Sequence, residues 1–308
     1  MTSTTSAPAP RPLHDRPAPP LVVAVDGGRN SDAALDWAAA EATALGCPLH
    51  LVHVHPVDTT WPAVGIGSPV PPADDDDVLR QGLERVRAAG VGTEAVLRSV
   101  GGDVGHQLVR ASTEATAVVV GAPRHGVVGQ AFLGSVAMSV AGHAHCPVAV
   151  VRAATRRGAP SEGVVAGIDG SSSDAAVLQL ALQRARRTGL PLSIVHAWTT
   201  DYVPPSPRTA DVEPAVRRSE RRASAVVDAA VARLGVAGTG VEVREQIADG
   251  DPVSALVRAS ASAESLVVGT RGLSPRGGLL MGSVSQALVR RSLSPLLVVR
   301  AAGEHPGE

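Results

Sequence analysis

The chain has 308 residues, of which 44% are hydrophobic and 19% charged, and its net charge is −1. This balance is typical of a globular protein of about two domains, and it predicts no non-specific attraction to nucleic acid or to an anionic membrane. All 28 residues of the Lys and Arg class are arginine, which excludes mechanisms that need the lysine of a P-loop, a protein kinase or a Schiff base.

Apolar runs alternate with helical spacings along the first half of the chain. Continuous apolar stretches predict strands buried on both faces, and the 3.6-residue spacings between them predict helices. The predicted strands are 21–25, 48–55, 93–100, 117–120 and 147–153, and the predicted helices are 31–45, 74–89, 104–113 and 135–144. We expect Ser31 or Asn30 to cap the first helix, Gly46 to end it, and the acidic start of the second helix to be solvated. The alternation predicts an α/β fold with a parallel sheet covered on both faces.

The second half of the chain repeats the first. Asp26 and Asp169 are 143 residues apart, whereas Gly134 and Gly282 are 148 apart. The five extra residues fall in the proline-rich stretch 199–214, where added length costs little. The repeat predicts two homologous domains. Their expected bounds are 20–153 and 163–302, with a linker at 154–162 and tails at 1–19 and 303–308.

The N-terminal tail and the lengths of the apolar runs indicate where in the cell the protein is expected. Residues 1–19 are rich in proline, alanine, serine and threonine, which predicts disorder, and they hold no apolar core of a secretory signal. No apolar run is as long as a membrane span. We therefore expect a cytoplasmic protein with no membrane partner.

Two loops compete as the ligand site, because ligands of open doubly wound sheets bind beyond the carboxyl ends of the strands. The loop after the first strand of each domain begins with Asp26 or Asp169. It lacks the G-x-G-x-x-G pattern. Its carboxylate either accepts a hydrogen bond from an amino group or ribose hydroxyl, or merely starts a turn before the helix, and the residues favour neither alternative.

The loop after the fourth strand of the second domain is rich in glycine and arginine. It runs from Gly269 to a predicted helix start at Gly282 and Ser283, and it contains Arg271 and Arg276. Glycines allow close approach of the backbone to a ligand, and a helix N-terminus offers free N–H groups to an anion. With hydroxyl donors from Ser283 and Ser285, the pattern favours a phosphate cradle built without lysine. The alternative is a flexible surface loop with an ordinary helix cap.

These motifs resemble those of the universal stress proteins, in particular the tandem-domain kind. The pattern G-x2-G-x9-G-S occupies residues 269–283, and the stretches at 164–176, 194–198 and 294–301 accompany it. The resemblance covers nearly everything between residues 20 and 302. It implies two flavodoxin-like domains, each a doubly wound, parallel five-stranded sheet of strand order 3-2-1-4-5, that bind ATP with Mg²⁺.

In the ATP-binding branch, the resemblance implies that the aspartate contacts the adenine region and that the residue after the second-strand histidine lines the base pocket. The glycine loop and Gly-Ser then hold the ribose and the triphosphate. In the second domain the matching positions are Asp169, Ala197, Val268, Gly269, Gly272, Gly282, Ser283, Val284 and Ser285. Ala197 departs from the usual valine and would loosen the contact with the base.

The first domain departs further from the family pattern. Its matching site positions are Asp26, Val54, Val120, Gly121, Gly134, Ser135 and Val136. Arg124 replaces the second glycine and Ala137 replaces a serine. A left-handed backbone at position 124 would cost on the order of 1–2 kcal/mol without glycine. We therefore predict that the first site is weaker or empty.

The resemblance also implies pairing of the domains through their last strands, 146–153 and 294–301, within one chain, as a pseudo-dimer. A further homodimer is left open. Metal sites are not expected, because His53 and His55 have no carboxylate or cysteine at short spacing and closed zinc sites need four ligands.

The function expected from these features is that of an ATP-binding stress regulator, non-catalytic or at most very slowly hydrolysing, read by an unidentified protein partner. No nucleophile elbow or pair of catalytic carboxylates is found. Two alternatives remain open: an enzyme of the same architecture that hydrolyses ATP or transfers its parts, and a nucleotide-free interaction scaffold.

Overall fold

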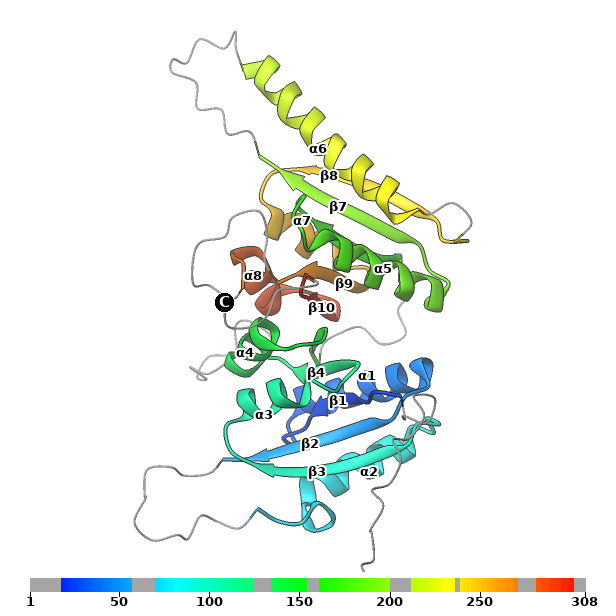
Figure 1. The fold of residues 1–308 in the computed structure, drawn as a ribbon, viewed down its shortest axis with the longest axis vertical. Coiled ribbons are helices and arrows are strands. Elements are labelled where there is room, and N and C mark those ends of the chain that lie inside the picture. Colours follow the sequence, from blue (N-terminus) through cyan, green and yellow to red (C-terminus); the bar gives the residue numbers. More distant parts are fainter. Residues whose placement is uncertain are drawn as a thin grey trace, which may run out of the picture.

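The structure is a computed structural model, and it describes residues 18–56, 70–123, 134–153, 161–199, 212–235, 239–270 and 281–301. Strands and helices alternate through both halves of the chain (Figure 1). The first domain contains β1 (Leu21–Ala24), α1 (Arg29–Leu45), β2 (Leu49–His55), the one-turn 3₁₀ helix η2 (Ala73–Asp75), α2 (Asp77–Ala88), β3 (Ala95–Gly101), α3 (Val104–Ala111), β4 (Ala117–Gly121), α4 (Ser135–His143) and β5 (Val148–Val151).

The second domain repeats this succession. It contains β6 (Gly163–Ile168), α5 (Asp174–Thr188), β7 (Leu192–Trp198), α6 (Val212–Leu234), β8 (Val243–Asp249), α7 (Pro252–Ala259), β9 (Ala263–Gly269), α8 (Ser283–Arg291) and β10 (Leu296–Val299). Among the described residues, no helix is both long enough and apolar enough to cross a bilayer.

The ten strands in the described part of the chain form one sheet, in the order β3-β2-β1-β4-β5-β10-β9-β6-β7-β8. The predicted order 3-2-1-4-5 is therefore confirmed in both domains, as β3-β2-β1-β4-β5 in the first and β8-β7-β6-β9-β10 in the second. Neighbouring strands are parallel within each domain, whereas β5 and β10 are antiparallel, with Val150 opposite Leu296 and Val148 opposite Val298. The predicted pairing through the last strands is confirmed, and the two domains form a pseudo-dimer stacked along the long axis (Figure 1).

The core has two layers, one on each face of the sheet. Leu35 of α1, Leu79 of α2 and the corresponding residues of α5 and α6 pack on one face. Leu108 of α3, Leu288 of α8 and residues of α4 and α7 pack on the other. Because both faces are covered, a strand such as β4 can be apolar throughout: Val119 belongs to the first layer, and its two neighbours belong to the second.

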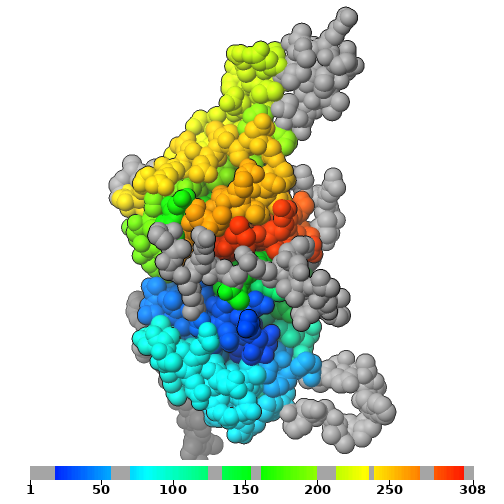
Figure 2. All heavy atoms as spheres, turned by 180° about the vertical axis from the view of Figure 1, so that it is seen from behind, coloured from blue at the N-terminus to red at the C-terminus, as the bar shows by residue number. Residues whose placement is uncertain are grey.

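Charged side chains join the domains beside the strand seam. Arg184 of α5 is 3% exposed and donates to Glu41 of α1 at 2.8 Å and to Glu264 of β9 at 2.6 and 2.7 Å. Its guanidinium also lies over the Trp37 ring, 5.1 Å from the centroid. The space-filling view from behind shows the two domains in contact across the middle of the molecule (Figure 2).

The start of α1 differs from the prediction. Gly28 is the N-cap residue and makes no side-chain cap hydrogen bond, while Ser31 lies inside the helix. The Ser31 hydroxyl instead accepts a hydrogen bond from the Asp26 N–H at 3.0 Å, which fixes the turn between β1 and α1. The predicted helix end at Gly46 is confirmed, since this glycine has a left-handed backbone with φ 64°.

The acidic start of the second helix is also a correction. The prediction placed 74–89 in one helix with a solvated beginning, but η2 ends at Asp75 and α2 begins at Asp77. Asp76 between them is 3% exposed, and it caps α2 by accepting from the N–H groups of Val78 and Leu79. Its burial is not visible in the sequence, because it depends on side chains from β2.

Candidate functional site

A cavity of about 260 Å³ lies beyond the carboxyl ends of the strands in the second domain. It occupies the place where β6 is flanked by β7 on one side and β9 on the other, which is the switch point of the sheet. Eight of the nine site residues predicted for this domain line it: Asp169, Ala197, Val268, Gly269, Gly282, Ser283, Val284 and Ser285. The ninth, Gly272, lies outside the described residues, together with Arg271 and Arg276.

One side of the cavity is apolar. Val195 of β7, Val268 of β9 and Leu256 of α7 are buried and contribute to its lining. Leu256 packs so closely on β6 that a side chain at Gly167 would begin 2.9 Å from its Cδ2 atom. Glycine at this position therefore brings the wall formed by α7 close to the strand. The resulting surface suits a flat apolar group rather than a charged one.

Another part of the lining is formed by the start of α8. The helix begins at the predicted position, with Gly282 as the N-cap residue. The Gly282 backbone is extended, and its N–H donates to the Thr270 carbonyl at 2.7 Å. The first backbone bond of the helix runs from the Gln286 N–H to the Gly282 carbonyl. The N–H groups of residues 283–285 consequently have no acceptor within the helix. They give this end of α8 a partial positive charge.

Ser285 plays a different part from the one expected. Its buried hydroxyl donates to the Gly269 carbonyl at 2.6 Å, so its proton is already used. This bond ties the first turn of α8 to the end of β9. In this arrangement the Ser285 hydroxyl proton is directed at the Gly269 carbonyl, and a donor role of Ser285 toward a ligand, like that of the exposed Ser283, stays a prediction.

The turn after β6 is held by two carboxylates. Asp169 Oδ1 accepts from the Ser171 N–H at 3.0 Å, and buried Asp174 accepts from the N–H groups of Asp169 and Gly170 at 3.3 and 2.8 Å. Burial raises the pKa of Asp174 above its usual value. The two hydrogen bonds from backbone N–H groups lower this pKa, but their effect is smaller than that of burial. Asp169 thus starts a turn, as one alternative predicted, and it also lines the cavity, as the other requires.

The first domain places its seven predicted residues at the equivalent positions. Asp26 makes the same turn and accepts from the Gly28 N–H at 2.8 Å, while Val54 and Val120 are buried near the ends of β2 and β4. At Gly121 an added Cβ would lie 2.6 Å from the backbone of Asn30, so this glycine is required for packing against α1.

The helix start of the first domain is built differently. Gly134 caps α4 with a left-handed backbone of φ 100°, unlike the extended backbone of Gly282, and Ser135 and Val136 open the helix. Ala137 has no hydroxyl to make the bond that Ser285 makes. Arg124, Gly126 and Gly129 lie outside the described residues.

A larger cavity of about 530 Å³ lies elsewhere, beside the contact between the domains. Trp37, Arg152 and Glu264 are among its lining residues, and none of the predicted site residues is. Size alone therefore does not identify the functional site.

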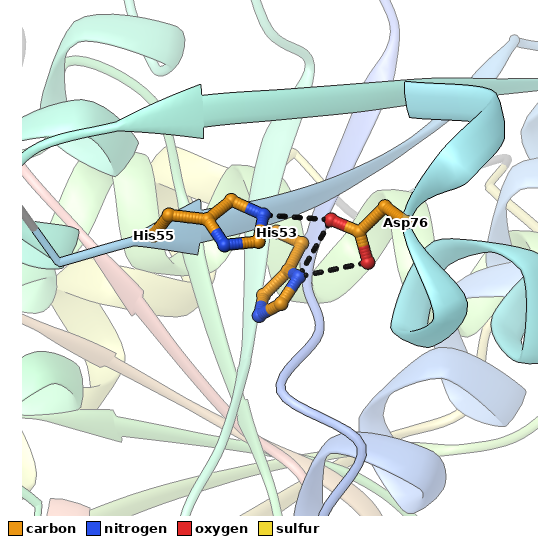
Figure 3. Close-up of side chains that lie close together, drawn as sticks. All are labelled: His53, His55 and Asp76. Atoms are coloured by element: carbon orange, nitrogen blue, oxygen red, sulfur yellow. Dashed lines mark hydrogen bonds and ion pairs between the residues drawn. The ribbon is translucent and has the colours of Figure 1, made fainter. Parts of the chain in front are cut away.

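A cluster on the outer part of the first domain was missed by the sequence analysis. His53 Nδ1 lies 2.8 Å and His55 Nε2 also 2.8 Å from the same oxygen, Oδ2, of Asp76 (Figure 3). Burial opposes ionisation of Asp76, but hydrogen bonds from the two imidazoles and the Leu79 N–H outweigh it and hold the pKa of this carboxyl below its usual range. The only sequence signal is the pair of histidines two residues apart on a strand.

The fold and the cavity together define a class: tandem doubly wound α/β proteins whose candidate ligand site lies beyond the carboxyl ends of the strands. The model of the Universal stress protein family matches residues 19–152 and, a second time, residues 162–300. The chain therefore belongs to the universal stress protein family and carries its domain twice, as the motifs indicate.

Relatives share this whole arrangement. The chain is 33% identical over 297 residues to a universal stress protein of Mycobacterium tuberculosis, a match that covers 91% of this chain and 96% of the relative. It is 29% identical over 292 residues to a universal stress protein of Mycolicibacterium smegmatis, with the same shares covered. The crystal structure of a universal stress protein from Archaeoglobus fulgidus DSM 4304 superimposes with a TM-score of 0.62 at 21% identity, covering 92% of this chain and 99% of that chain, and supports the fold.

Proposed function

We propose that the second domain binds ATP together with Mg²⁺, and that the chain acts as a nucleotide-dependent regulator in a stress response. The observation that carries this proposal is the convergence of eight predicted residues from four separate segments on one cavity. The segments are the turn after β6, the end of β7, the end of β9 and the start of α8.

The two sides of the cavity match the two ends of a nucleotide. The apolar side, with Val195, Leu256 and Val268, suits the flat base. The start of α8 suits phosphate, because unpaired N–H groups and the helix dipole both attract an anion there. Asp169 also lines the cavity, and its carboxylate can accept a hydrogen bond from an amino group or a ribose hydroxyl.

We expect one ATP per chain. In the first domain the serine that fixes the helix start to the strand is replaced by Ala137, and the cap residue Gly134 has a different backbone conformation. Arg124 also stands where the family has glycine. These departures weaken the first site relative to the second.

The proposed role is binding rather than turnover. The cavity lining described by the structure contains two carboxylates and three serines, but no histidine to act as a general base and no arginine to stabilise a transferring phosphate. A nucleotide shifts a protein only between states that it distinguishes, so the regulatory effect requires a segment that differs between the bound and free states. Steady release of ADP or AMP by the purified chain would contradict this role and favour an enzyme.

A charge placed at the start of α8 tests the proposal. Gly282→Asp keeps a backbone that any residue adopts and introduces a preferred N-cap residue, so the fold should persist. Its negative charge would lie where the phosphates are expected. We expect the purified chain to carry about one ATP, measured by chromatography after denaturation, and the variant to lose it, with affinity falling by more than roughly tenfold.

The matched control is Gly282→Asn, which has nearly the same size and cap preference but no charge. It should retain most of the ATP affinity. An equal loss in both variants would point to steric exclusion and not to an anion site at α8. No nucleotide in the purified chain, and none bound after addition of ATP and Mg²⁺, would overturn the proposal and favour the scaffold alternative.

A further inference from the structure

The cluster of His53, His55 and Asp76 has the composition and the geometry of a metal site. Its three ligand atoms, Nδ1, Nε2 and Oδ2, all lie within 4.8 Å of one another. A zinc ion bonded at about 2.0–2.2 Å in tetrahedral geometry separates its ligand atoms by roughly 3.3 Å. The two nitrogen-to-carboxylate separations of 2.8 Å would have to widen by about half an ångström, and the two nitrogens lie no more than 4.8 Å apart.

The surrounding structure holds these ligands in place. His53 and His55 project from the same face of β2, two residues apart, with ring centroids 4.3 Å apart. Asp76 is fixed from the other side, because its Oδ1 accepts from the N–H groups of Val78 and Leu79 at 3.0 and 3.2 Å while Oδ2 faces the imidazoles. The backbone thus supplies the second layer of hydrogen bonds that orients a metal-binding carboxylate.

The site is closed on one side and open on the other. The Asp76 side chain is 2% exposed, whereas those of His53 and His55 are 18% and 27% exposed. A metal ion bound here would have three protein ligands and one position open to solvent. Metal sites of this kind bind a water or another small ligand at the open position.

We propose that His53, His55 and Asp76 bind one divalent transition-metal ion per chain, with zinc as the simplest candidate. Two neutral imidazoles and one carboxylate suit zinc and the neighbouring first-row ions rather than Mg²⁺, which prefers oxygen ligands. Binding requires each imidazole to carry its proton on the other ring nitrogen, His53 Nε2 and His55 Nδ1. The metal would join the end of β2 to the start of α2.

The second domain does not repeat this site. Trp198 occupies the position of His55, and His196, at the position of His53, donates from Nδ1 to the Ile168 carbonyl at 3.0 Å. The metal site is therefore distinct from the proposed nucleotide site: it belongs to the other domain. Within the first domain, Val54 lies between the two histidines on β2, and its side chain projects to the other face of the sheet, where it packs with α3 and α4.

The test is a titration of the metal-free full chain with Zn²⁺, without nucleotide and with Mg²⁺ in excess, followed by calorimetry. We expect one Zn²⁺ per chain. The variants His53→Gln, His55→Gln and Asp76→Asn should each weaken this binding by more than roughly tenfold. Asp76→Asn keeps an oxygen that can accept the two cap hydrogen bonds, so it separates loss of the ligand from loss of the helix cap.

The matched control is His50→Gln, which removes a histidine from the same strand outside the cluster. It should leave zinc binding unchanged, as should Gly282→Asp, which affects only the nucleotide proposal. Co²⁺ bound at the site should show visible absorption typical of nitrogen and oxygen ligands in a low-coordinate site, lost in Asp76→Asn. No zinc binding, or binding that the three cluster variants leave intact, would overturn the proposal.

Discussion

Single side chains decide how the candidate nucleotide site is built. In the second domain Ser285 uses its hydroxyl to fix the start of α8 to the carbonyl of Gly269. In the first domain the same position is Ala137. One oxygen atom therefore separates a helix start that is bonded to its strand from one that lacks this bond.

Replacing Ser285 by alanine should weaken the second domain. The change removes a buried hydrogen bond of 2.6 Å, which is worth about 1 kcal/mol, or more if the carbonyl is left without a partner. We expect urea unfolding to report a loss of this size and ATP binding to weaken, because the helix start is less well fixed. Ser283→Ala, at an exposed hydroxyl two residues away, should leave the free energy of unfolding nearly unchanged.

At the scale of elements, the helices bring the walls of the site together. α7 contributes Pro252 and Leu256 to the cavity, and it begins at an N-cap, Asp251, whose Oδ2 accepts from the Ser254 N–H at 2.8 Å and from the Ser254 hydroxyl at 2.7 Å. These bonds hold the pKa of Asp251 below its usual range. The position of the apolar wall thus depends on a cap outside the cavity.

Asp251→Ala should destabilise the chain by about 1 kcal/mol, as the loss of an N-cap does. Because the pKa of Asp251 is lowered in the folded chain, its contribution is present above the usual aspartate pKa and is lost as the pH falls through the lowered value. Denaturant unfolding at neutral and acidic pH measures both effects. Asp251→Asn is the control, since it keeps the cap without the titration; an unchanged pH dependence in that variant would contradict the assignment.

The sequence was sufficient to predict the strands and helices, but it was not sufficient to predict contacts between side chains of distant elements. Apolar runs such as 117–120 predicted the strands, because strand formation depends on local composition, and the resemblance to the universal stress proteins implied the sheet order and the domain pairing. The burial of Asp76 depends on His53 and His55, which are 23 and 21 residues away. Nothing local distinguishes Asp76 from its three acidic neighbours, so the cluster became visible only in three dimensions.

On the scale of the whole molecule, the two domains are joined by more than the strand seam. Arg184 contacts Glu264 within its own domain and Glu41 in the other, 143 residues away along the chain. Arg187 also donates to Glu41, at 2.5 Å. The buried guanidinium therefore couples the stability of the second domain to the presence of the first.

Arg184→Met should destabilise the chain by up to about 3 kcal/mol, because it leaves Glu41 and Glu264 partly buried without their main partner. Thermal unfolding of the variant should have a lower midpoint. Because Arg184 couples the two domains, their unfolding should then separate into two transitions. Arg244→Met removes an arginine that pairs with Glu242 on the surface, and we expect no measurable change there. A loss of the same size in both variants would contradict a special role for Arg184.

The antiparallel seam between β5 and β10 has one more consequence. In a symmetric dimer of identical subunits every amino-acid change occurs twice, so neither binding site can be altered alone. Here the two partners are encoded in one polypeptide, and a change such as alanine for serine at position 137 affects one partner only. In a fused chain each domain can therefore acquire different residues while the pairing of β5 with β10 is kept. The proposed nucleotide site of the second domain and the proposed metal site of the first are two such differences.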